Sequence, residues 1–247
     1  MSKLVKLELR NLFRQKSFLI CLLISVALII IGILASNFLN EMAKQAGETE
    51  LLLGVNAFDN IMGYLSGSNL GILFAIVIAI YFGSESSDGT VKNIIGTGYK
   101  RSEFFISKVI CVVVMSLIFI IVSLIINYLM CLIMGIDLGV FNFSTFGCVC
   151  LTIIALAITF SSLSFIIFKT SANIVANICI PMLLPLVFAL FDTLTKLNFK
   201  LSDFWIQNTT LLFTKSSKLP FMIIVSICYI VVFIILGISL TKRKEIK

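Results

Sequence analysis

Long apolar runs constrain this chain more than any other feature of its sequence. The first covers residues 17–36 and contains no charged side chain. A helix rises about 1.5 Å per residue, so a run of this length can cross the roughly 30 Å hydrocarbon core of a bilayer. Five further apolar runs follow, at 67–83, 105–134, 146–168, 174–191 and 219–240. The sequence therefore predicts an all-α integral membrane protein with six transmembrane helices.

The composition leaves little material for anything outside the membrane. Hydrophobic residues make up 60% of the 247 residues and charged residues 13%, whereas soluble domains have about 45–50% and about 25%. Six spans consume most of the apolar residues. We therefore expect a single transmembrane domain over 1–247 and no separate catalytic domain.

The Lys and Arg residues are unevenly divided between the connecting segments. Four segments hold 14 of the 19 and carry a net charge of +9, namely 1–16, 84–108, 169–173 and 241–247. The remaining connecting segments hold 5 and carry a net charge of −2. Because basic segments stay in the cytoplasm, we expect a multi-pass protein of the cell membrane with both termini cytoplasmic. Its basic charge then faces membrane lipid, and a nucleic-acid partner is excluded because no basic domain lies away from the bilayer.

Residues 1–16 carry the pattern of an amphipathic helix. Apolar residues recur at helical spacing on one face, at Val5, Leu9, Leu12 and Phe13. Basic residues occupy the opposite face, at Lys3, Lys6, Arg10 and Arg14. This pattern predicts an elbow helix that lies on the inner leaflet and leads into the first span. A basic flank that only orients the first span is the alternative.

Two long outer segments differ in character. Residues 37–66 form an acidic outer loop of about 30 residues, and 192–218 contain apolar pairs broken by polar residues. The second pattern suits short helices that lie at the outer interface or re-enter it. Trp205 is the one tryptophan of the chain, and we expect it to anchor at headgroup level.

The fourth and fifth predicted spans contain residues that are unusual in a transmembrane helix. Proline within a helix removes a backbone donor and bends the helix. Hydroxyl and amide side chains face another helix or a transport pathway. The candidates for a pathway or for helix packing are Thr159, Ser161, Ser162, Asn177, Pro181 and Pro185.

Several kinds of chemistry are absent from the sequence. No ionisable side chain lies in the middle of a predicted span, which argues against an ion-coupled carrier. The chain has no His, and we find no nucleophile–base pair, no paired carboxylates and no zinc-like pattern among its seven Cys. We therefore expect no catalytic residue, no metal and no enzyme activity of its own. No G-x-x-x-x-G-K-[ST] phosphate loop is present, so any ATP must be bound by another subunit.

The segment 84–104 between the second and third predicted spans is the most informative. Ser86, Ser87 and Asp88 are suitable N-caps, and the residues after them form a short apolar face at Val91, Ile94 and Ile95. Gly96 and Gly98 end the pattern. These features predict a short cytoplasmic helix parallel to the membrane. Glu85 either pairs with Arg101 or Lys108 or remains solvated.

This segment resembles the first cytoplasmic loop of type-2 ABC transporter permeases. The matching positions are Glu85, Gly89, Thr90, Lys92, Gly98, Arg101 and Lys108. The size, the basic elbow and the inside termini agree as well, so the resemblance covers essentially the whole chain. Lys100 departs from the small polar residue that often precedes the Arg. Within the family, the chain is most similar to small Gram-positive permeases for export of, or immunity to, lantibiotics and bacitracin.

The resemblance implies a coupling helix over about 88–98 that docks on a cytoplasmic ABC ATPase subunit. ATP and Mg²⁺ would be bound by that partner, and a second permease chain, identical or related, would complete the assembly. The implied ATPase-coupling residues are Glu85, Asp88, Gly89, Thr90, Val91, Lys92, Ile94, Ile95, Gly98, Arg101 and Lys108.

The resemblance also implies a function, the ATP-driven export or clearance of amphipathic antimicrobial peptides. The alternative is a membrane sensor or immunity protein that transports nothing and binds a peptide at its acidic outer loop.

Overall fold

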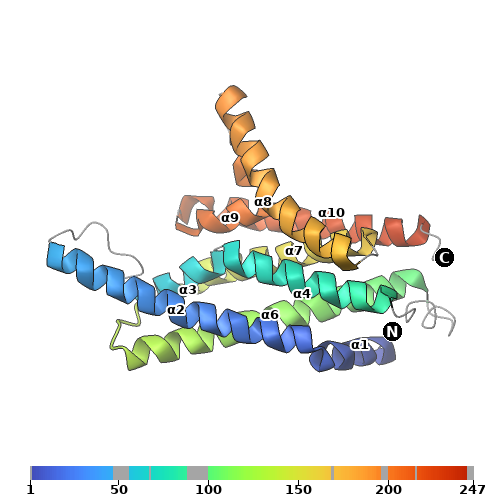
Figure 1. Ribbon diagram of the computed structural model, residues 1–247. Coiled ribbons are helices and arrows are strands. Elements are labelled where there is room, and N and C mark those ends of the chain that lie inside the picture. Colours follow the sequence, from blue (N-terminus) through green and yellow to red (C-terminus); the bar gives the residue numbers. More distant parts are fainter. Residues whose placement is uncertain are drawn as a thin grey trace.

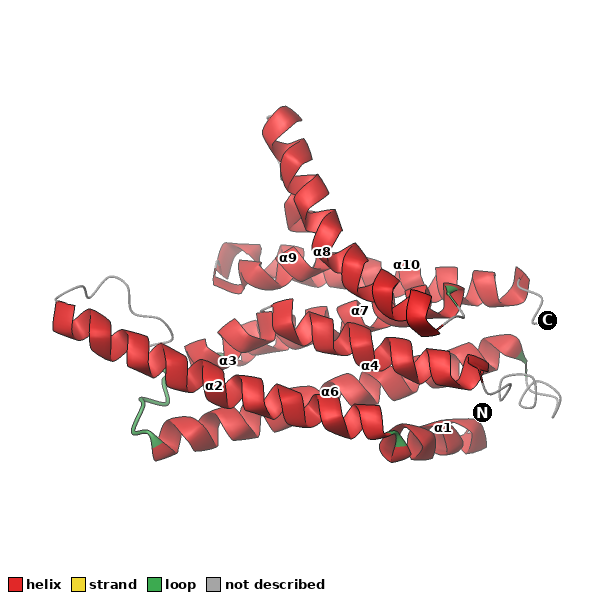
Figure 2. Ribbon diagram, viewed as in Figure 1, coloured by secondary structure: helices red, strands yellow, loops and turns green. Residues whose placement is uncertain are grey.

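The apolar runs of the sequence form long helices that lie side by side in a bundle, in a computed structural model of the chain (Figures 1 and 2). The structure describes residues 2–46, 56–66, 68–87, 100–167, 170–195, 200–214 and 216–243. Every regular element within these ranges is helical, which confirms the all-α prediction.

Within the described ranges, eight longer helices build the bundle. They are α1 (Ser2–Arg14), α2 (Lys16–Ala46), α3 (Ala57–Ser66), α4 (Ser68–Ser87), α6 (Arg101–Ile133), α7 (Phe143–Ile166), α8 (Thr170–Thr195) and α10 (Leu219–Arg243). Between α8 and α10, the described residues form four short helices, which are η2 (Leu201–Phe204), α9 (Ile206–Thr210), η3 (Leu211–Thr214) and η4 (Ser216–Lys218).

Five of the described helices are each long and apolar enough to cross a membrane, at Lys16–Gln45, Ser102–Ile133, Phe143–Ile166, Ser171–Leu194 and Leu219–Thr241. A sixth crossing requires α3 and α4 together, because these two helices are bent by 48° at a short break. The apolar part of α4, Leu70–Gly83, is about 21 Å long and falls short of the hydrocarbon core by itself. The described helices therefore provide five spans, or the predicted six if α3 and α4 form one crossing.

The prediction that 37–66 is an outer loop is wrong for most of its length. Helix α2 continues to Ala46, and α3 occupies Ala57–Ser66. Ala57 and Ile61, one helical turn apart, are fully buried. Because that apolar face packs into the bundle, α3 extends α4 instead of crossing open solvent. Glu48 and Glu50, on which the acidic-loop prediction partly depends, lie outside the described residues.

Helix α7 is the centre of the bundle and packs against α4, α6 and α10. Its residues from Ala155 to Ser162 are all buried, so no face of this stretch is left for lipid. Aromatic rings fill the space around it, with Phe105 and Phe165 5.4 Å apart and Phe74 and Phe119 5.3 Å apart between their centroids. Both pairs meet edge to face, the favoured geometry.

Helix α10 approaches α6 closely at Gly237. A Cβ atom at this position would overlap the ring of Phe105. Only glycine therefore permits this separation between the two helices.

Helix α8 starts within the bundle and then turns away from it, which Figure 1 shows clearly. Its early residues Asn173 and Asn177 are buried, whereas Leu190 and Leu194 near its end are 64% and 81% exposed. Pro181 and Pro185 lie inside this helix, as predicted.

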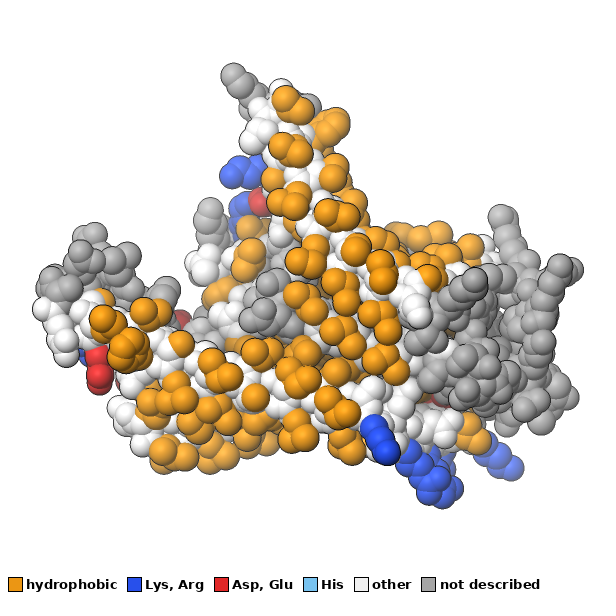
Figure 3. Space-filling view, in the orientation of Figure 1, with side chains coloured by type: hydrophobic (Ala, Val, Ile, Leu, Met, Phe, Trp, Pro, Cys, Tyr) orange, Lys and Arg blue, Asp and Glu red, His pale blue; other side chains and the backbone are white. Residues whose placement is uncertain are grey.

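On the face shown in Figure 3, apolar side chains cover the flanks of the helices. The basic residues of α1 gather at one end of the bundle, where Lys3, Lys6, Arg10 and Arg14 are exposed (Figure 3). An apolar belt with a basic end is the surface expected of a protein that lies in a bilayer.

Candidate coupling end and transport cavity

Most of the predicted coupling residues lie outside the described residues. This applies to Asp88, Gly89, Thr90, Val91, Lys92, Ile94, Ile95 and Gly98. Glu85 and Arg101 lie in α4 and α6, but their side chains are not described. The predicted coupling helix therefore stays a prediction. The structure does describe the two helices that carry this segment, since α4 ends at Ser87 and α6 begins at Arg101.

Helix α6 begins with a local hydrogen bond that suits its sequence. The backbone N–H of Lys100 donates to the carboxylate of Glu103 in the first turn, at 3.4 Å. An acidic side chain in this position also favours the positive end of the helix dipole. Lys100, the departure from the family pattern, therefore occupies the N-cap of α6 with an exposed side chain.

Lys108 is the one predicted coupling residue with a described side chain, and it is buried. Its Nζ lies 3.0 Å from Oε2 of Glu8 in α1, and the two side chains are 1% and 0% exposed. The hydroxyl of Tyr81 in α4 donates to the same Oε2 at 2.8 Å. The Lys108 ammonium also sits 3.8 Å from the centroid of the Tyr81 ring, in cation–π geometry. Three helices therefore meet at this cluster.

Glu8 is the functional candidate that the sequence analysis missed, and the amphipathic pattern of α1 held the signal for it. The buried side chains of α1 are Leu4, Glu8 and Leu12, which are spaced four residues apart. A carboxylate in the middle of a buried stripe must find a partner. Phe13, which was predicted on this stripe, is instead 49% exposed. It lies at the edge of the stripe, where its ring meets Phe18 edge to face at 5.8 Å.

The three candidate polar residues in α7 donate hydrogen bonds to backbone carbonyls, two within α7 and one to α10. Thr159 and Ser161 donate to the carbonyls of Ala155 and Ala157 in their own helix, at 2.9 and 2.8 Å. Ser162 donates across to the carbonyl of Phe233 in α10, at 2.8 Å. Their geometry favours packing over a transport pathway.

Two amide side chains attach the first half of α8 to its neighbours. Asn177 Nδ2 donates to Ser164 Oγ of α7 at 2.7 Å and to Asn173 Oδ1 at 2.9 Å. Asn173 Nδ2 in turn donates to the carbonyl of Ala79 in α4, at 3.2 Å. These bonds fix α8 to the bundle just before its two prolines.

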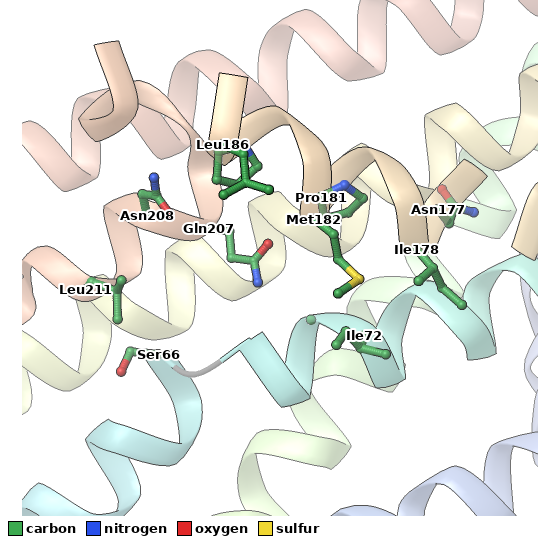
Figure 4. A pocket seen from close by; sticks show the side chains of 12 residues that line it. Ser66, Ile72, Asn177, Ile178, Pro181, Met182, Leu186, Gln207, Asn208 and Leu211 are labelled. Atoms are coloured by element: carbon green, nitrogen blue, oxygen red, sulfur yellow. The ribbon is translucent and has the colours of Figure 1, made fainter. Parts of the chain in front are cut away.

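A cavity of about 450 Å³ opens where α8 turns away from α4 (Figure 4). It is lined by residues of α3, α4, α8, α9 and η3, which are Ser66, Gly71, Ile72, Asn177, Ile178, Pro181, Met182, Pro185, Leu186, Gln207, Asn208 and Leu211. Three of the predicted pathway candidates line it, namely Asn177, Pro181 and Pro185. The wall is mostly apolar, with three amide side chains and no charged group among these residues. Such a wall suits an apolar, uncharged part of a molecule.

The far wall of this cavity comes from the short helices after α8. Ile206 and Thr209 of α9 are fully buried, and the Thr210 hydroxyl donates to the carbonyl of Ser66 at 3.1 Å. The segment therefore contains short helices, as predicted, and packs into the bundle. The prediction for Trp205 is wrong, because its ring is 7% exposed and faces Phe188 of α8 at 6.3 Å. Burial of α9 carries the indole into the protein.

Within the described ranges, no group of three or more His, Cys, Asp or Glu side chains is placed to hold a metal ion. The seven Cys residues are free thiols, of which four are buried, Cys150 is half-buried, and Cys179 and Cys228 are exposed.

Residues 4–192 match the family model of the ABC-2 family transporter protein. The match takes in about three quarters of the chain, from α1 to the last turn of α8. This chain belongs to the ABC-2 family of transporter proteins. No curated protein matches it significantly. The resemblance to type-2 ABC permeases is thereby confirmed at the level of the family.

Membership in the ABC-2 family, together with the apolar helices, makes this chain a multi-pass membrane permease subunit of an ABC transporter. The family implies a separate ABC ATPase subunit as its partner, in which ATP hydrolysis takes place.

Proposed function

We propose that this ABC-2 permease exports or clears amphipathic antimicrobial peptides, with energy from ATP bound with Mg²⁺ in its partner. The observation that carries the proposal is the uncharged cavity beside the two prolines of α8. An amphipathic peptide offers apolar side chains to such a wall, together with backbone groups that can bond to the amides of Asn177, Gln207 and Asn208.

Helix α4 supports this proposal because it connects the predicted coupling segment to the cavity. Its last residue, Ser87, adjoins the predicted coupling segment, and Gly71 near its start lines the cavity. The distance between them along the helix is about 24 Å. A helix of this length transmits a displacement at one end to the other, so a push on the segment 88–98 would change the shape of the cavity.

In the proposed assembly, two permease chains, identical or paired with a sister chain, stand on two ATPase subunits in the cell membrane. Both termini are cytoplasmic, and the coupling residues predicted above contact the ATPase. Each cavity then lies toward the outer half of the bilayer.

The test is a pull-down of the C-terminally tagged permease from its native membrane in mild detergent, with mass identification of its partners and an ATPase assay. We expect an ABC ATPase to co-purify, and we expect I94D/I95D to abolish its recovery. The matched control is V140D, because Val140 lies in the loop between α6 and α7 and is 89% exposed. A stable complex that contains no ATPase would support the sensor or immunity alternative instead.

A further inference from the structure

The cluster of Glu8, Tyr81 and Lys108, hereafter the inner latch, is built more elaborately than helix packing requires. A buried ion pair is weak evidence for stability, since apolar residues of similar volume often serve equally well. Here the pair is 3.0 Å long and almost fully buried, and the Tyr81 hydroxyl bonds the same carboxylate oxygen. Such a group fixes one arrangement of its three helices, because any other arrangement would leave a charge without its partner.

The position of the inner latch relates it to the predicted coupling segment. Tyr81 lies six residues before the end of α4, and Lys108 lies seven residues after the start of α6. Both are therefore about 10 Å from the helix ends that carry the segment. Glu8 adds α1, which is attached to α6 a second time where Cys111 Sγ approaches the carbonyl of Val5 at 4.0 Å.

Helix α1 would also be held by the lipid surface, in competition with the latch. Its basic residues are exposed on the face opposite Glu8, where anionic lipid headgroups would attract them. Without the latch, α1 would remain at the lipid surface while α4 and α6 moved. With the latch, α1 must follow the two helices.

We propose that Glu8 and Lys108 are positioning residues that force α1 to move together with the inner ends of α4 and α6 when the ATPase displaces the segment between them. This inference rests on the proposed function, because it requires an ATPase to drive the motion. In this arrangement the elbow helix is a moving part of the permease and carries the displacement along the inner leaflet.

The test requires a variant that removes the latch without leaving a buried charge behind. Glu8→Met together with Lys108→Met removes both charges and keeps apolar volume, so the fold should survive. The charge exchange E8K/K108E restores a pair and serves as the rescue. S107A is the matched control, because it removes a buried hydroxyl next to Lys108 that donates to Phe104 within α6, and it leaves the latch unchanged.

The readout is the motion of two fluorescent labels in the complex of permease and co-purified ATPase in lipid nanodiscs. Ser replaces Cys150, Cys179 and Cys228, the thiols that are not buried. A label is then attached in separate samples at L7C on α1 or at I110C on α6, positions that are 48% and 37% exposed. Trapping with Mg-ATP and vanadate should shift the emission of both labels when the latch is intact and in S107A.

In E8M/K108M we expect the response at L7C to be lost while the response at I110C remains, and we expect E8K/K108E to restore it. A full response at L7C in E8M/K108M would overturn the inner latch and leave the proposed function standing. If no ATPase co-purifies, or neither label responds with the latch intact, the proposed function fails and the latch fails with it.

Discussion

At the scale of single residues, Gly237 allows us to predict how tightly α10 is placed against α6. Gly237→Ala pushes a methyl group into the ring of Phe105, and overpacking of this kind costs about 1–3 kcal/mol of unfolding free energy. Gly32→Ala is the matched control, since a Cβ there meets nothing within 4 Å and alanine favours a helix by up to about 1 kcal/mol. Thermal unfolding in detergent measures both, and equal midpoints would contradict the close contact.

The buried pair gives a second prediction at this scale. Glu8→Gln leaves the Lys108 ammonium buried beside a neutral amide, and breaking one side of such a pair costs about 3–5 kcal/mol. We expect a clear fall in the unfolding temperature for E8Q and a small change for E8M/K108M. An E8Q protein as stable as the unaltered one would mean that water reaches this pair.

Sequence reasoning identified Lys108 through the family pattern and named Glu85 as one candidate partner, whereas the structure pairs Lys108 with Glu8. The partner is 100 positions away, and no local pattern connects Glu8 with Lys108. Only the four-residue spacing of Leu4, Glu8 and Leu12 could have shown that Glu8 faces inward.

At the scale of elements, the cavity beside α8 is open to a direct test. Met182→Trp adds a large ring at a position that lines the cavity. If the proposed function holds, the resistance of cells that express this variant to a lantibiotic or to bacitracin should fall several-fold. Leu190→Trp is the control, because it adds the same ring on the same helix at a residue that is 64% exposed and lines no part of the cavity. Growth inhibition measures the effect, and equal resistance in both variants would remove the cavity from the proposed pathway.

The long helices were predictable because length and apolar character alone determine them. Helix α3 was not, because 57–66 is short and mixes polar with apolar residues, and its apolar face is recognised only once it is seen to be buried. Trp205 was misplaced for a related reason. Tryptophan favours the membrane interface, but the packing of α9 places Trp205 inside the bundle.

At the scale of the whole molecule, the distribution of basic residues predicts the orientation. We expect L138C, between α6 and α7, to react with a membrane-impermeant maleimide in intact cells. K100C, at the start of α6, should react only after the membrane is permeabilised, because basic segments stay inside. Both positions are exposed in the structure. If K100C reacted in intact cells and L138C only after permeabilisation, the predicted orientation would be wrong.

The family and the all-helical architecture could be inferred from the sequence because both depend on features that extend over the whole chain. The cavity could not, because it arises where α8 turns away from the bundle and meets short helices that follow some twenty residues later. The six candidate residues were predicted one by one. Only the fold shows that Asn177, Pro181 and Pro185 line the cavity, whereas Thr159, Ser161 and Ser162 do not.

The inner latch also has a consequence for the biogenesis of this membrane protein. Glu8 leaves the ribosome long before Lys108, so α1 must wait at the membrane surface until the helix that carries its partner has been inserted. The Lys108 ammonium reaches the edge of the bilayer without its counter-charge, and Glu8 pairs with it only when α1 docks. Chains whose α1 is deleted or obstructed by a bulky N-terminal fusion should therefore be degraded by quality-control proteases, while fusions at the other end should be tolerated.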